Sequence, residues 1–124
     1  MAGRVVDASA VAMLLFGEPG AEKVAAALDG HELHAPSLLP YEVASVARKK
    51  AMSHPDLATA VLDATRRLED LAITLVDVDP AEIARLAVRV GVSAYDAAYL
   101  WLADRLRMPL VSFDRRLLAA AGRS

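Results

Sequence analysis

The chain has 124 residues, of which 56% are hydrophobic and 24% charged, and its formal net charge is −2. This composition predicts one folded domain, which we place over residues 1–124, and excludes a disordered chain. There is no cysteine, which excludes disulfides and thiolate metal sites and fits a reducing cytoplasm. The longest apolar stretch, residues 8–16, is shorter than the ~18 residues that a membrane span needs. We therefore expect a soluble cytoplasmic protein with no membrane segment.

The first quarter of the chain predicts a strand and two helices. Val5 and Val6 form a short apolar strand that ends at Asp7. Residues 8–16 are apolar all round, as in a buried helix. A Gly-Glu-Pro-Gly turn then leads to a second helix over residues 21–29.

The same order of elements is predicted in the middle of the chain. Residues 32–35 predict a second strand, and Ser37 is placed to cap a helix that runs to about residue 53. Apolar residues recur at a 3.6-residue spacing over 57–71, which predicts another helix. Residues 73–78 form a third apolar strand.

The last third of the chain predicts three helices and one strand. A helix over residues 80–90 opens with proline and stops before a glycine. Ser93 can cap a helix over 94–107, and the apolar residues 110–113 predict a fourth strand before a last short helix near 117–121. Short apolar strands between pairs of helices indicate an α/β fold with three layers, α/β/α, in which helices cover both faces of a short parallel sheet.

Four carboxylates occupy positions that such a sheet would bring to one edge. Asp7 and Asp114 directly follow the first and last predicted strands. Glu42 lies in the first turn of the helix after the second strand, and Asp96 in the first turn of the helix before the last strand. Because ligands bind outside the carboxyl ends of the strands in open parallel sheets, we expect these four acids to lie near one another.

Two explanations of these acids remain open at this point. Each acid is near a helix N-terminus, where capping alone would explain it. A cluster of all four would need more, because two carboxylates ~4 Å apart repel by about 4 kcal/mol at an effective dielectric of 20. Divalent cations remove such repulsion, and oxygen ligands without cysteine or nearby histidine favour Mg²⁺ or Mn²⁺ over Zn²⁺. A metal bound in this way suits phosphodiester hydrolysis by water.

The segments that carry these acids resemble those of a known family. VVDASAV, YEVASV, SAYDAAYLWLA and LVSFDRRL follow one another with 35, 54 and 18 residues from each acid to the next. In this ordered set the whole chain resembles PIN-domain proteins, and more narrowly the VapC-type toxins of bacterial toxin–antitoxin pairs. The resemblance implies an α/β/α fold and an endoribonuclease that depends on Mg²⁺ or Mn²⁺. It also implies a homodimer and a cognate antitoxin protein as partner.

The resemblance assigns roles to individual residues of this chain. Asp7 and Asp96 would be the principal metal ligands, and Glu42 and Asp114 would complete the acidic cluster. All four would therefore be catalytic residues.

Residues next to these acids are assigned supporting roles. Ser9 and Ser112 match small hydroxyl positions that orient the acids. Many relatives carry a further acid soon after the fourth, where this chain has Arg115 and Arg116, so a second metal position is in question. The two arginines are candidates for contact with RNA phosphates.

Other functions fit parts of the pattern. A phospho-receiver domain needs an acidic pair after its first strand and a lysine after its last, and this chain has neither. A non-catalytic PIN-like module that binds RNA or protein stays open, as does a purely structural domain with capped helices. Nucleic-acid-binding domains are usually basic, but neutralising the four acids would turn the formal charge from −2 to +2.

Overall fold

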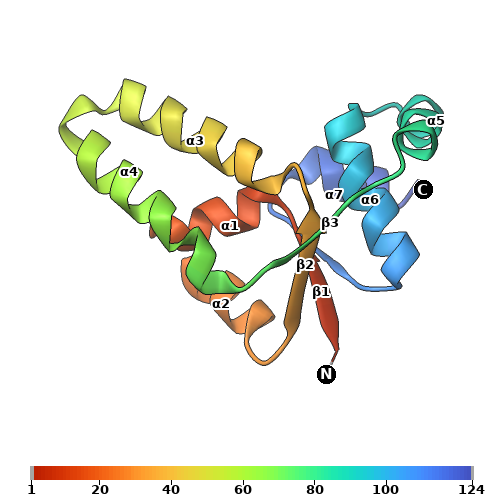
Figure 1. The fold of residues 1–124 in the computed structure, drawn as a ribbon, viewed down its shortest axis with the longest axis horizontal. Coiled ribbons are helices and arrows are strands. Elements are labelled where there is room, and N and C mark those ends of the chain that lie inside the picture. The colour runs from red at the N-terminus through yellow and green to blue at the C-terminus, as the bar shows by residue number, and fades with distance from the viewer. Residues whose placement is uncertain (1, 124) are drawn as a thin grey trace.

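A four-stranded parallel sheet forms the centre of the protein, in a computed structural model that describes residues 2–123 (Figure 1). Its strands lie in the order β3-β2-β1-β4. Their bounds are β1 (Gly3–Val6), β2 (Glu32–Pro36), β3 (Thr74–Val76) and β4 (Leu110–Val111). All three pairings are parallel, with Val5 beside His34 on one side and beside Leu110 on the other.

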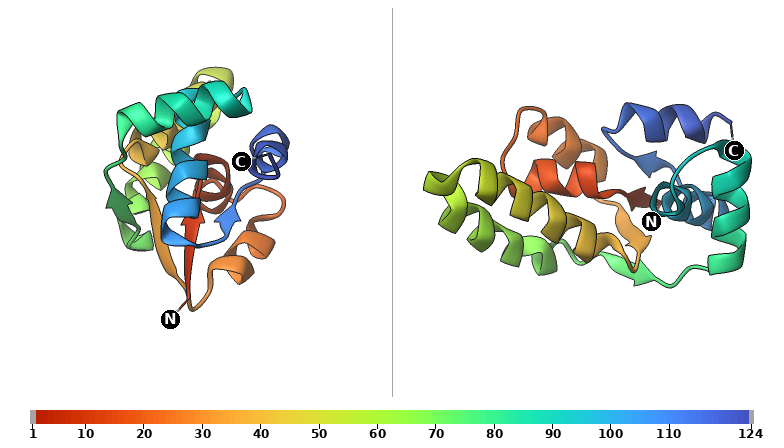
Figure 2. Two further views of the ribbon diagram at one scale, coloured as in Figure 1. Left: turned by 90° about the vertical axis from the view of Figure 1, so that its right-hand side faces the viewer. Right: turned by 90° about the horizontal axis from the view of Figure 1, so that it is seen from above.

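Helices flank this sheet, which confirms the predicted α/β/α fold (Figures 1 and 2). Those in the described residues are α1 (Ala8–Leu15), α2 (Ala21–Leu28), α3 (Leu39–Ser53), α4 (Ala58–Thr65), α5 (Pro80–Val90), α6 (Ala94–Leu106) and α7 (Arg115–Ala121), with 3₁₀ turns η1 (Pro55–Leu57) and η2 (Arg66–Leu71). None of these helices is long and apolar enough to cross a membrane.

The strand order places the helices. The chain moves from β1 to β2 to β3 in one direction, and right-handed crossovers put α1 to α4 on one face. It then returns past β1 to form β4, so α5 and α6 cover the opposite face (Figure 2). The reversal leaves β1 and β4 as neighbours at the topological switch point, where ligands of open α/β sheets bind.

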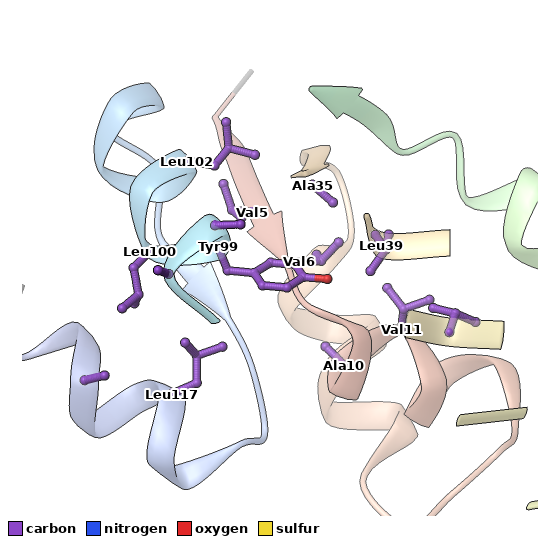
Figure 3. Packing of buried hydrophobic residues seen from close by; sticks show 14 of the residues in the cluster. Val5, Val6, Ala10, Val11, Ala35, Leu39, Tyr99, Leu100, Leu102 and Leu117 are labelled. Carbon is purple, nitrogen blue, oxygen red and sulfur yellow. The ribbon is translucent and has the colours of Figure 1, made fainter. Parts of the chain in front are cut away.

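The core lies between the sheet and both helix layers. Val5 and Val6 of β1 have no exposed surface, and neither do Leu39 of α3 and Leu102 of α6. Figure 3 shows these side chains around Tyr99, whose ring reaches from α6 past Val6 toward Leu39. Burial of one such aliphatic side chain contributes about 1.5–3 kcal/mol to folding, so β1 and α6 are held firmly relative to each other.

Several predicted boundaries were wrong, each for a local reason. Ser37 does not cap α3: its amide donates to the Val76 carbonyl at 3.0 Å, and the N-cap is Leu38, whose side chain makes no capping bond. The helix expected over 57–71 divides, because α4 ends at Thr65 and a 3₁₀ segment continues to Leu71. The predicted strands 73–78 and 110–113 are shorter than expected, since only the residues that pair with β2 and β1 are extended in register. The Ser93 cap is confirmed, with its hydroxyl accepting from the Asp96 amide at 3.0 Å.

Replacing Leu102 with alanine tests the packing of α6 on the sheet. We expect the Leu102→Ala variant to lose about 2–5 kcal/mol of unfolding free energy, because it opens a cavity in a site with no exposure. Val88→Ala, at an α5 residue that is 86% exposed, should stay within about 0.5 kcal/mol of the parent. Urea titration followed by circular dichroism measures both, and equal losses would contradict the core described above.

Candidate active site

The four predicted acids come from four different elements and share one neighbourhood. Asp7 and Asp114 follow the adjacent strands β1 and β4, while Glu42 and Asp96 lie in the first turns of α3 and α6. The charge of Asp114 acts on Asp7 and Asp96, and the charge of Asp7 acts on Glu42 and Asp96. Asp96 acts on Glu42 in turn. The structure thus brings all four carboxylates within electrostatic range at the switch point.

Asp7 is held by the densest set of hydrogen bonds in this neighbourhood. Its side chain is only 4% exposed. Oδ1 accepts from the Ser9 hydroxyl at 2.7 Å and from the Ala10 amide at 3.0 Å, while Oδ2 accepts from the Ser112 hydroxyl at 2.5 Å. Asp7 is therefore the N-cap of α1 as well as a member of the acidic cluster. Burial raises the pKa of Asp7, and these three hydrogen bonds work against that increase.

The two serines connect Asp7 to the segment that carries Asp114. Ser9 Oγ accepts from the Phe113 amide at 2.9 Å, and Ser112 Oγ accepts from the Asp114 amide at 3.0 Å. Each hydroxyl therefore donates to Asp7 and accepts from the loop after β4. This arrangement fixes the distance between the ends of β1 and β4.

Asp114 also has a structural role. Its Oδ1 accepts from the amides of Arg116 at 2.9 Å and Leu117 at 3.2 Å, which caps α7. Its Oδ2 accepts no hydrogen bond from the described part of the chain. Capping thus explains why an acid follows β4, but it uses only one of the two oxygens.

Glu42 and Asp96 do not cap their helices. Leu38 occupies the N-cap position of α3, and the Ser93 hydroxyl already caps α6. Burial raises the pKa of Glu42 most strongly, with the charges of Asp96 and Asp7 adding to the effect. Burial likewise raises the pKa of Asp96, and Asp114 and Asp7 add to it while Arg116 opposes it. Helix capping therefore leaves these two acids unexplained.

Tyr99 is a site residue that sequence reasoning did not assign to the acids. Its hydroxyl donates to Glu42 Oε1 at 2.6 Å, although the residue is only 2% exposed. Burial and the Glu42 carboxylate raise the pKa of Tyr99, so it remains a donor at neutral pH. The signal in the sequence was its position three residues after Asp96, which puts both side chains on one side of α6.

The chemistry of the donor set fits a hard divalent cation. No hydrogen bond within residues 2–123 reaches Glu42 Oε2 or either carboxylate oxygen of Asp96. The two ion pairs of the described residues lie elsewhere, between Lys50 and Glu18 and between Arg105 and Glu82. The same residues contain no preassembled group of three acid or histidine ligands. Mg²⁺ accepts such a site, because it usually keeps several waters and takes one or two carboxylates together with substrate phosphates.

Comparisons with known proteins identify the family. The family profile of the PIN domain matches residues 4–123. The chain belongs to the PIN-domain family. Ribonuclease VapC3 of Pyrobaculum aerophilum is 36% identical to this PIN domain over 121 residues, which cover 91% of this chain and 90% of that protein. Ribonuclease VapC9 of Mycobacterium tuberculosis is 35% identical over 113 residues, which cover 91% of this chain and 87% of that one.

A solved structure supports the same assignment. The crystal structure of PAE2754 from Pyrobaculum aerophilum superposes on this PIN domain with a TM-score of 0.79. The two chains are 28% identical, and the match covers 96% of this chain and 84% of the other.

The acidic cluster should make the metal-free PIN domain less stable as pH rises. The pKa values of Asp7, Glu42 and Asp96 are raised above their ordinary values of 3.8 and 4.5. The folded protein therefore binds protons more tightly than the unfolded chain, and unfolding free energy falls as pH rises from about 4 through these raised values. In EDTA, we expect the melting temperature to decrease as the pH rises above the ordinary carboxyl pKa values of 3.8 and 4.5.

The Asp7→Asn variant removes the charge and keeps the cap of α1, and it loses one acceptor, because an amide nitrogen in place of Oδ2 cannot accept from the Ser112 hydroxyl. Asparagine caps helices about as well as aspartate, so the variant should melt a few degrees higher than the parent at pH 7 and depend less on pH. Asp63→Asn, at an exposed position of α4, serves as the control and should leave the pH profile unchanged. Loss of stability in Asp7→Asn at pH 7 would show that the hydrogen bonds of the carboxylate outweigh its repulsion.

Proposed function

We propose that this PIN domain is a metal-dependent endoribonuclease and the toxin component of a toxin–antitoxin pair. The observation that carries the proposal is the pair Glu42 and Asp96. Both are acids whose pKa is raised by burial and by neighbouring carboxylates, and neither caps a helix or forms an ion pair within the described residues. Relatives named as ribonucleases over about nine-tenths of this chain support the same chemistry.

The proposed metal site uses the four acids in different ways. Asp7 and Asp96 would hold Mg²⁺ or Mn²⁺, with Glu42 and Asp114 completing the coordination directly or through water. A divalent cation bound there supplies charge neutralisation at the scissile phosphate and lowers the pKa of water. Asp7 suits a fixed anchor, because three hydrogen bonds prevent its carboxylate from turning.

Glu42 is the residue we assign to proton transfer. Tyr99 holds its Oε1, so Oε2 is the oxygen left to accept a proton from the attacking water. A general base works best when its pKa approaches the working pH, and burial moves the pKa of Glu42 in that direction. Attack by water rather than by the ribose 2′-hydroxyl should give a 5′-phosphate and a 3′-hydroxyl.

The partners that we propose follow from the proposed ribonuclease function. RNA is the substrate, and Arg115 and Arg116, both exposed at the start of α7, are proposed to contact its phosphates. A cognate antitoxin and a second copy of the chain are proposed protein partners. Large apolar side chains exposed on α3 and α4, such as Tyr41, Met52 and Leu62, offer the kind of surface that protein partners bury.

A non-catalytic module that binds RNA or protein is the alternative. It is favoured by one observation, the lack of a preassembled group of three acid or histidine ligands among the described residues. Such a module would bind its partner equally well with and without divalent cations, and it would cleave nothing.

Cleavage of total RNA by purified, antitoxin-free protein tests the proposal. We expect discrete fragments with 5′-phosphate ends in Mg²⁺ or Mn²⁺ and none in EDTA. Asp96→Asn should reduce the cleavage rate by about 100-fold or more, and it should leave the fold intact because the Asp96 side chain accepts no hydrogen bond within residues 2–123. Asp104→Asn, an exposed acid in the last turn of the same helix, is the matched control and should cleave like the parent.

Two outcomes would contradict the proposed mechanism. Fragments that end in a 2′,3′-cyclic phosphate would show that the ribose hydroxyl, and not water, is the nucleophile. Folded protein that neither cleaves RNA nor gains thermal stability from Mg²⁺ or Mn²⁺ would favour the non-catalytic module.

A further inference from the structure

A cavity of about 430 Å³ opens directly beside Asp96. One wall is the turn between α5 and α6, with Val92 and Ser93. The other wall is the side of α7 that carries Arg116, together with Arg123 just after that helix. Figure 2 shows α7 lying beside α6. The volume is within the range of sites that bind small molecules or one unit of a polymer, about 300–1,000 Å³. The cavity is thus contiguous with the acidic cluster and has the size of a nucleotide unit.

The charges around this cavity favour an anion. Arg116 and Arg123 bring two guanidinium groups against the single carboxylate of Asp96. Arg123 is partly fixed, because one of its nitrogens donates to the Val90 carbonyl at 3.3 Å while the other N–H groups remain available. Arg116 acts electrostatically on Asp96 and forms no side-chain hydrogen bond within residues 2–123. If a cation neutralises Asp96, the cavity carries two uncompensated positive charges.

The positions of the two arginines fit a shared anion. They are seven residues apart, and Gly122 between α7 and Arg123 keeps helical backbone angles. Seven residues make about two helical turns, so both side chains lie on one side of the helix. The lining contains no aromatic side chain on which a base could stack. Guanidinium groups pair with phosphate through two parallel hydrogen bonds.

We propose that this cavity binds the backbone phosphate of a nucleotide next to the scissile bond, through Arg116 and Arg123. The inference rests on the proposed ribonuclease function and adds a substrate subsite to it. Arg123 lies outside the segments that suggested the function, and Arg115 does not line the cavity although it is adjacent to Arg116 in sequence. The proposed subsite therefore assigns different roles to Arg115 and Arg116, although the sequence alone suggests the same role for both.

Binding of a fluorescently labelled, mixed-sequence single-stranded RNA measures the subsite directly. Fluorescence anisotropy is recorded in Mg²⁺ over a series of salt concentrations, with every variant made in the Asp96→Asn background, so that the charge of Asp96 is absent from the cavity and cleavage is slow. Arg116→Ala and Arg123→Ala should each weaken binding about 3- to 10-fold near 0.1 M salt and reduce the slope of log K against log salt by about 1. Arg115→Ala should weaken binding less than Arg116→Ala. Arg66→Ala, exposed directly after the last residue of α4 and outside the lining of the cavity, should bind like the parent.

Cleavage kinetics in Mg²⁺ give a second, independent readout. A subsite that only binds the neighbouring phosphate should raise KM in Arg116→Ala and Arg123→Ala while changing kcat by less than about twofold. Circular dichroism and melting temperature identify any variant that fails to fold. Arg123→Lys, which retains the charge but not the planar fork, should recover part of the lost affinity.

The binding and cleavage results together distinguish failure of the subsite from failure of the ribonuclease function. If the parent cleaves RNA while Arg116→Ala and Arg123→Ala bind it like Arg66→Ala, the subsite is wrong and the ribonuclease function stands. That result would leave the cavity to a different anion, such as an acidic segment of a protein partner. If folded parent protein neither binds nor cleaves RNA, the proposed function fails and the subsite fails with it.

Discussion

The hydrogen bonds of the buried Asp7 carboxylate are the constraint on which the rest of the site depends. They join the end of β1 to α1 through the Ala10 amide and to the loop after β4 through Ser9 and Ser112. A buried carboxylate without partners would be too costly to retain, and the hydrogen bonds from the two serines oppose the increase in the pKa of Asp7 that burial causes. Ser112 also accepts from the Asp114 amide. The same hydrogen bonds therefore fix the position of Asp114, the acid that follows β4.

The four acids divide into two kinds with different energetic consequences. Asp7 and Asp114 cap the starts of α1 and α7, so each has a structural role that does not depend on a ligand. Glu42 and Asp96 contribute no cap or ion pair and add repulsion to a partly buried site. Residues that lower stability without a compensating local contact are expected at functional sites. The pair without a structural role is therefore more informative about chemistry than the pair that the fold itself requires.

The sequence predicted the sheet and the four acids because both depend on local patterns. A short apolar run such as Val5–Val6 indicates a buried strand, and an acid directly after it must lie at the carboxyl end of the sheet. The break after Thr65 was missed because Leu68 and Leu71 are three residues apart, a spacing that fits one side of an α-helix as well as one side of a 3₁₀ helix. Ser37 was misassigned because α3 begins at Leu39, so the N-cap position falls on Leu38, one residue later than predicted. Tyr99 and Arg123 were missed as site residues because their partners, Glu42 and the cavity beside Asp96, come from elements distant in the sequence.

The two halves of the proposed site have opposite charges, and this couples the ligands that they bind. A cation at the acids removes the repulsion that would otherwise keep an RNA phosphate away from Asp96, and a phosphate near Arg116 offsets the positive charge that the cation adds. Each ligand therefore lowers the free energy of binding the other, and by thermodynamic linkage the two effects are equal. On the proposals made above, the cation and the substrate phosphate would therefore bind cooperatively, with Arg116 and Arg123 beside the cavity that Asp96 lines.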